Sequence, residues 1–235
     1  MIPVLIFQNP PALSAKDFSA RCGELSKARD WPGLEALARN QAAASPKDAS
    51  AQAALGFALL AQKKAVEGKA ACEAALKLDP KQMQALFYLG LEAAQEGDQN
   101  GVLAIAKRIE SIKPLVAVQF MRNPVIQRAV VPGTDLPLVE GNQVHFKAAS
   151  MGALQDYVSE ASGGRLAVAV IALTVGPDGV PTMAEVLVAS PGLLAPQVEK
   201  AANECRVAPI QADGKPTAFR CIIDLAVNKP GDGGL

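Results

Sequence analysis

This chain of 235 residues has a single histidine, His145, and only 4% aromatic residues. One histidine cannot form a two-histidine zinc site, and no serine or cysteine lies in a Gly-x-Ser-x-Gly nucleophile motif. The glycine clusters also lack the spacing of phosphate-binding loops. We therefore expect no catalytic residue, no metal site and no bound cofactor, and we predict that the protein is not an enzyme. His145 is expected to be a loop or strand histidine without a chemical role.

Net charge is absent as well, because 23 basic residues balance 23 acidic ones. Divided at Pro114, the chain has 14 basic and 12 acidic residues in its first part and 9 and 11 in its second. Neither part has the basic excess that phosphate binding requires, so no nucleic-acid partner is expected. The longest apolar run, 166–171 extended to 175, is far shorter than the roughly 20 residues of a transmembrane helix, and we expect no membrane span in this chain.

The two ends of the chain are expected to lie outside the fold. Residues 2–7 are apolar but have no basic residue before them, so they do not form a signal peptide as they stand. Residues 1–12 are either a stub left by a missing or mis-assigned start, which is a truncated leader, or a mobile arm that ends at the prolines. Residues 229–235 form a glycine-rich tail.

A repeat is present in the first half of the chain. Pro46, Pro80 and Pro114 are spaced by 80 − 46 = 34 and 114 − 80 = 34 residues. This is the period of a helix-turn-helix repeat, in which a small residue sits where two helices pack closely. Gly56 and Gly90 occupy that position in the second and third repeats.

These features resemble tetratricopeptide repeats. The resemblance covers three units between residues 13 and 114, and a capping helix over 115–129 completes a domain at 13–130. It implies an all-α solenoid whose first helices line a concave, protein-binding groove. The groove residues are then Ala53, Phe57, Leu60, Gln84, Phe87, Leu91 and Gln95.

The predicted groove contains no lysine or arginine at 51–62 or 82–95. This argues against a basic clamp for a C-terminal carboxylate and favours an apolar helix or extended peptide as partner. The alternative is that Phe87 and Leu91 pack against the neighbouring unit.

The second half has a different pattern. A segment rich in proline and glycine predicts a linker, assigned to 131–156. From Arg165 onward the order is strand, Asp-Gly turn, strand, short helix and strand. In the last strand, Phe219, Cys221, Ile223 and Leu225 alternate with more polar positions, which predicts one buried face.

This order resembles the C-terminal domain of TonB, the periplasmic energy transducer of Gram-negative bacteria. The matching motifs are VAVIALTVGPDGVPTMAEVLVASPG at 168–192, AANECRVAP at 201–209 and DGKPTAFRCIIDLAV at 213–227. Val207 replaces an aromatic residue that is usual in the family. The resemblance implies a small antiparallel ββαβ domain at 157–228, and the whole chain is therefore assigned to the α+β class.

Cys205 and Cys221 are predicted to face the same core, one from the helix and one from the last strand. The resemblance implies an oxidising compartment, in which the two form a disulfide. The alternative is a pair of small, buried thiols that never oxidise.

Together these features predict a non-enzymatic, periplasmic protein-protein interaction module related to TonB energy transducers. Its partner would be a protein or peptide, such as a TonB-dependent outer-membrane receptor or an envelope complex. If the last strand lies at a sheet edge, a partner strand can pair with 217–227 next to Arg220, Ile222 and Asp224. The alternatives are an adaptor or assembly scaffold without energy transduction, and a non-catalytic subunit of an enzyme.

Overall fold

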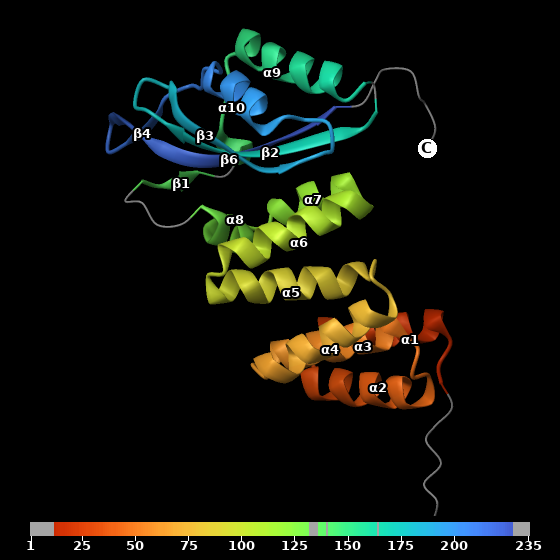
Figure 1. Cartoon of the computed structure of the whole chain (residues 1–235). Helices are drawn as coiled ribbons and strands as arrows, with labels where there is room; N and C mark the ends of the chain where they lie inside the picture. Colours follow the sequence, from red (N-terminus) through yellow and green to blue (C-terminus); the bar gives the residue numbers. More distant parts are fainter. Residues whose placement is uncertain (1–11, 132–135, 140, 164, 228–235) are drawn as a thin grey trace, which may run out of the picture. The chain divides into compact units, whose positions relative to one another are not determined.

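The computed structural model describes residues 12–131, 136–139, 141–163 and 165–227 (Figure 1). The predicted tail, all of the predicted arm except Ala12 and part of the predicted linker lie outside these ranges. The chain divides into two compact units, Met1–Glu92 and Ala93–Leu235. We call them unit 1 and unit 2 and describe each by itself.

Helix pairs repeat every 34 residues through unit 1 and into the start of unit 2. First helices begin at Ala15, Ala49 and Met83, and 49 − 15 = 83 − 49 = 34. Second helices begin at 31, 65 and 99 with the same spacing. The tetratricopeptide-like repeat region is thus present, with α5 running across the division between the units. The helices are α1 (Ala15–Lys27), α2 (Trp31–Ala44), α3 (Ala49–Ala61), α4 (Ala65–Leu78), α5 (Met83–Glu96) and α6 (Gln99–Ile112).

The residues before the second helices recur with the same period of 34 and determine where two of these helices begin. Asp30 and Asp98 cap α2 and α6 by accepting backbone hydrogen bonds from the glycines three residues later. The equivalent position before α4 is Lys64, which makes no capping bond and instead donates to Glu35 at 2.9 Å. The second repeat therefore replaces a cap with an ion pair to the first.

Close packing within a repeat depends on Gly56, as the sequence predicts. A Cβ at this position would lie 2.3 Å from the Cys72 sulfur, so only glycine allows α3 and α4 to approach this closely. The neighbouring core is made mainly of alanines, including Ala53, Ala75 and Ala85. Small residues thus set the short spacing between the helices of unit 1.

Unit 2 contains the end of α5 from Ala93 onward and then α6, α7 (Pro114–Met121) and α8 (Pro124–Val130). The single capping helix predicted at 115–129 is wrong, because Pro124 lacks the backbone N–H needed to continue α7. A second helix, α8, then starts at Pro124, and the Asn123 side chain caps it by accepting a hydrogen bond from the Val125 N–H. Phe120 and Ile126 are fully buried, whereas Leu115 is exposed.

A four-stranded sheet forms the centre of unit 2, in the order β1-β6-β2-β3. Its strands β2 and β3 are antiparallel and joined by a turn at Gly179, where φ is 81°. β6 is antiparallel to β2, and the short β1 is parallel to β6. The strands are β1 (Leu138–Val139), β2 (Ala167–Val175), β3 (Pro181–Ala189) and β6 (Phe219–Val227), and a separate hairpin contains β4 (Ile210–Ala212) and β5 (Lys215–Thr217).

Both faces of this sheet are covered (Figure 1). Odd-numbered residues of β2 and β6 form one core with α9 (Ala148–Ala161) and α10 (Ala195–Asn203). The opposite face meets α6 and α7, and there the buried Glu110 of α6 accepts a 2.7 Å hydrogen bond from Ser190. β2 is consequently buried along almost its whole length.

The predicted linker therefore does not mark the division between the units. The helices α6 and α7 pack on the sheet and α8 packs on both of them, so the division falls at Glu92 and Ala93 within α5. The segment assigned to the linker also contains most of α9, whose Leu154 and Val158 are fully buried. An amphipathic helix was overlooked there because prolines and glycines precede it.

No helix in the described part of the chain is long and apolar enough to cross a membrane.

Candidate functional site

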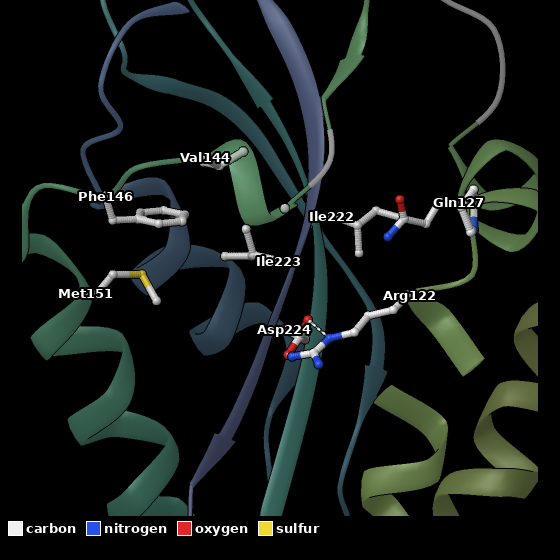
Figure 2. A pocket seen from close by; sticks show the side chains of 10 residues that line it. Arg122, Gln127, Val144, Phe146, Met151, Ile222, Ile223 and Asp224 are labelled. Carbon is white, nitrogen blue, oxygen red and sulfur yellow. Dashed lines mark hydrogen bonds and ion pairs between the residues drawn. The ribbon is translucent and has the colours of Figure 1, made fainter. Parts of the chain in front are cut away.

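The outer edge of β6 is the first candidate site (Figure 2). On this side, among the described residues, β6 pairs with β1 at two positions, Arg220 with Leu138 and Cys221 with Val139. Further along, the chain leaves the sheet in a 3-10 turn at Gly141–Gln143. The prediction that 217–227 lies at an edge is therefore wrong for the first part of β6, which is an interior strand.

Backbone alternation shows which groups face outward from β6. The N–H of Arg220 donates to the Pro137 carbonyl on the β1 side. Residues two and four positions later, Ile222 and Asp224, direct their backbone groups to the same side. The Ile222 carbonyl is covered by Gly141, where an added Cβ would lie 2.6 Å from that oxygen. Within residues 136–139, 141–163 and 165–227, the part of the outer edge without a strand partner thus begins at Asp224.

A cavity of about 590 Å³ lies along this edge. One wall is apolar, with Val144, Phe146 and Met151 beside Ile223. The other wall comes from α7 and α8 and contains Arg122 and Gln127 beside Ile222 and Asp224. In Figure 2 the first group lies on one side of the β6 ribbon, and Ile222, Gln127 and Arg122 lie on the other.

Arg122 and Asp224 form the charged part of the cavity. The Arg122 guanidinium donates from Nε to Oδ1 at 2.9 Å and from Nη2 to Oδ2 at 2.6 Å. Such a two-point ion pair is geometrically specific. The hydrogen bonds to Asp224 raise the pKa of Arg122 further above its ordinary value. The arginine side chain is 63% exposed and the aspartate 20%, so the guanidinium is the accessible member.

The structure places the three predicted edge residues differently from one another. Arg220 is buried, not exposed, and donates from Nη1 to the Val131 carbonyl. Ile222 is also buried, because helices cover the face that was predicted to be free. Asp224 alone lies at the unpaired part of the edge.

The groove of unit 1 is the second candidate site. A cavity of about 340 Å³ is lined by the first helices of the repeats together with Leu34 and Asp48. The α3 residues are Ser50, Ala54 and Phe57, and the α5 residues are Gln84 and Tyr88. Among its lining residues, Asp48 is the one charged side chain and no lysine or arginine is present. This agrees with the predicted absence of a basic clamp.

Aromatic contacts form one wall of this groove. Phe57 stacks on Tyr88 with ring centroids 4.5 Å apart and an angle of 8° between the planes. Trp31 meets Phe57 edge-on at 5.3 Å. The Trp31 carbonyl also accepts a hydrogen bond from Gln62, which donates to Glu35 as well. The rings are thus fixed by contacts between repeats.

The predicted groove residues are only partly brought together. Phe57 and Gln84 line the cavity, whereas Ala53 is buried in the contact between helices and Leu60 packs toward Gly68 of α4. Gln95 is exposed on the part of α5 that belongs to unit 2. Two half-buried residues, Phe87 and Leu91, do not line the cavity.

A small helical rotation explains the difference. The lining residues on α3 are 50, 54 and 57, not 53, 57 and 60. Adding the period of 34 to Ser50 and Ala54 gives Gln84 and Tyr88, so both α5 residues follow once the α3 face is known. Tyr88 was missed although this signal was present in the sequence.

The thiols are protonated at neutral pH. Burial raises the pKa of Cys72 and Cys221 to about 12 and that of Cys22, with help from Asp48, to about 11. Cys205 and Cys221 share the core of unit 2 as predicted, and both are free thiols, so the disulfide is not formed in this structure.

The described residues contain no group of three or more His, Cys, Asp and Glu side chains that could hold a metal ion.

Comparisons with known proteins identify no family for this chain. No family model matches the chain, and no curated protein does. A solved structure titled TPR2B-domain:pHsp70-complex of yeast Sti1 is similar at 17% identity and a TM-score of 0.42, covering 49% of this chain and 92% of its own.

Proposed function

We propose that this protein is a non-enzymatic protein-interaction module that binds an extended segment of a partner along the outer edge of β6. The observation that carries the proposal is the cavity beside a strand edge that no strand of the described part of the chain pairs with from Asp224 onward. An added strand gains main-chain hydrogen bonds from such an edge and specificity from its side chains.

The site is suited to one added strand and not to open-ended association. Helices occupy both faces of the sheet, and the cavity has a wall on each side of β6. An incoming strand would continue the ladder where β1 ends, with alternate side chains directed toward the two walls. A flat, unprotected edge would instead favour aggregation.

The same proposal includes a relationship to TonB-type energy transducers and a location in the periplasm. It is supported by the motifs at 168–192 and 213–227, which coincide with β2, β3, β5 and β6. Cell fractionation of the native gene product tests the location. Recovery entirely from the cytoplasm would contradict it.

An adaptor or assembly scaffold is the second candidate function. The aromatic groove of unit 1 favours it, because a second surface in a separate unit allows two partners to be held by one chain. A non-catalytic enzyme subunit stays the third alternative. Capture of two different partners, one lost with changes at Phe57 and the other with changes at Asp224, would favour the adaptor.

Proline substitution tests strand addition. The probe is a fluorescein-labelled hexapeptide of alternating valine and glutamine, which is extended and uncharged. Asp224→Pro removes the outward N–H and the carboxylate, whereas the control Asp224→Ala removes only the carboxylate. We expect Asp224→Pro to bind the probe about tenfold more weakly than Asp224→Ala, measured by fluorescence anisotropy.

The peptide backbone provides an independent control. N-methylation of alternate residues in the probe should abolish binding in one register, because only every second N–H faces the neighbouring strand. Thermal unfolding of each variant verifies that the sheet is intact. Equal affinity of folded Asp224→Pro and Asp224→Ala, or no binding of the probe to the unchanged protein, would refute strand addition.

A further inference from the structure

The two walls of the cavity beside β6 differ in chemistry, and this difference bears on the sequence of the partner. One wall is formed by Val144, Phe146 and Met151, and in the other Arg122 is the accessible charged group. Neighbouring residues of an extended strand point to opposite faces. A partner strand must therefore satisfy an apolar wall and a charged wall at alternate positions.

The accessible charge at this site is a hydrogen-bond donor. A guanidinium has five N–H groups, and Arg122 uses two of them on Asp224, which leaves 5 − 2 = 3 directed elsewhere. The carboxylate of Asp224 is mostly covered, at 20% exposure against 63% for the arginine. A partner side chain arriving on this wall therefore meets solvent-exposed N–H donors that Asp224 does not use before it meets the acid.

We infer that the partner segment alternates apolar residues with acidic ones, so that its carboxylates contact Arg122 and its apolar side chains enter the space between Phe146, Met151 and Ile223. This inference rests on the proposed function, because it requires a strand added to β6. Carboxylates are the acceptors that a guanidinium binds most strongly, by two parallel hydrogen bonds.

A lysine at the same partner position is disfavoured. It would approach a guanidinium that already neutralises Asp224, and a like charge opposite Arg122 is repelled. The Asp224 carboxylate is mostly covered and already paired with Arg122, and Gln127, a further polar side chain of this wall, carries no charge. The site therefore distinguishes acidic from basic partner segments.

Three labelled hexapeptides test the inference on the full chain: alternating valine with glutamate, with glutamine and with lysine. We expect the glutamate peptide to bind about tenfold more tightly than the lysine peptide at low salt, with glutamine between them. Arg122→Gln should remove this preference. The matched control is Arg128→Gln, which removes one exposed positive charge from unit 2 outside the cavity.

Asp224→Asn provides the opposite change. It keeps the backbone N–H and the side-chain size but releases the guanidinium, so the glutamate peptide should bind several-fold more tightly. Equal binding of glutamate and lysine peptides, or tighter binding of the lysine peptide, would overturn the inference and leave strand addition in place. Failure of all three peptides would refute the proposed function itself.

Discussion

The two candidate surfaces differ in what they are made of. The groove of unit 1 is lined by side chains from helices that repeat every 34 residues, with Phe57 and Tyr88 as its aromatic wall. The edge of β6 in unit 2 offers backbone groups from Asp224 onward, with side chains only at its walls. Substitutions should therefore alter the groove through shape and packing, whereas the edge is sensitive to changes that remove or block main-chain hydrogen bonds.

The two edges of the sheet show the same contrast within unit 2. At the β3 edge, Glu199 of α10 accepts a hydrogen bond from the Val186 N–H at 3.1 Å, and Pro181 begins the strand. Both features discourage pairing with another strand. At the β6 edge a cavity is present instead. One edge is closed and the other accessible, which is why we place partner binding at β6.

The largest expected effect tests whether the groove depends on its aromatic wall. Phe57→Ala removes the stacking on Tyr88 and the edge contact with Trp31. We expect unit 1 to lose about 2 kcal/mol of stability, because a half-buried ring and two aromatic pairs are lost. The single tryptophan reports on unit 1 alone, so its fluorescence during denaturant unfolding measures this loss.

The control for this variant is Gln84→Ala, which changes an exposed lining residue and should alter stability by less than about 0.5 kcal/mol. Similar stabilities for the two variants would mean that the aromatic wall does not organise the groove.

The second prediction concerns the helices that cover both faces of the sheet. Because they cover the faces, a partner can reach only the edges. Ser190→Ala removes the hydrogen bonds that Ser190 makes with Glu110 and with the Val168 N–H, all of them buried. We expect unit 2 to lose about 1–3 kcal/mol, because buried polar groups are left without partners. Unfolding followed by circular dichroism measures this loss of stability. Ser111→Ala is the exposed control, and equal stability of both variants would count against the role given to Ser190.

A third prediction sharpens the contrast between the two edges. Glu199→Ala frees the partly buried Val186 N–H and opens the β3 edge. We expect a loss of about 1 kcal/mol, together with concentration-dependent self-association in light scattering. Glu204→Ala, an exposed position at the end of α10, is the control. A monomeric Glu199→Ala variant would show that Glu199 does not protect this edge.

The smallest expected effect is a pH dependence confined to unit 1. Hydrogen bonds from Lys64, Arg39 and Gln62 lower the pKa of Glu35 from 4.5 to about 2. A lowered folded-state pKa stabilises unit 1 above pH 4.5, and this contribution is lost as the pH falls toward 2. Unfolding followed by tryptophan fluorescence should show that the stability of unit 1 decreases as the pH falls from 4.5 toward 2. The Glu35→Gln variant should not show this decrease. An identical acid dependence of both proteins would refute this role.

The sequence predicted the helix pairs well because their signal is local and periodic. The proline spacing and Gly56 identify the repeat, and Gly56 indeed allows α3 to contact α4. The groove face was predicted only in part, because the lining residues of α3 begin three positions before the predicted ones, and three positions rotate a helix face by about 60°. Tyr88 therefore took the place assigned to Phe87.

Unit 2 was harder to predict because its contacts are distant in sequence. The hairpin of β2 and β3, the helix α10 and the strand β6 all lie near their predicted positions. No local pattern could indicate that Leu138 pairs with Arg220 or that α6 and α7 pack on the second face of the sheet. These two contacts bury Arg220 and Ile222 and limit the accessible edge to Asp224 and the residues after it.

Amide hydrogen exchange of the full chain, with and without the alternating valine-glutamate peptide, tests partner binding at β6 most directly. Asp224 and Ala226 direct their N–H groups outward from β6, and Ala184 does so from β3, by the same alternation. We predict that the peptide slows exchange at Asp224 and Ala226 and leaves Ala184 unchanged. Protection confined to Phe57, Tyr88 and their neighbours, with exchange at Asp224 unaltered, would contradict the account and place binding in the groove of unit 1.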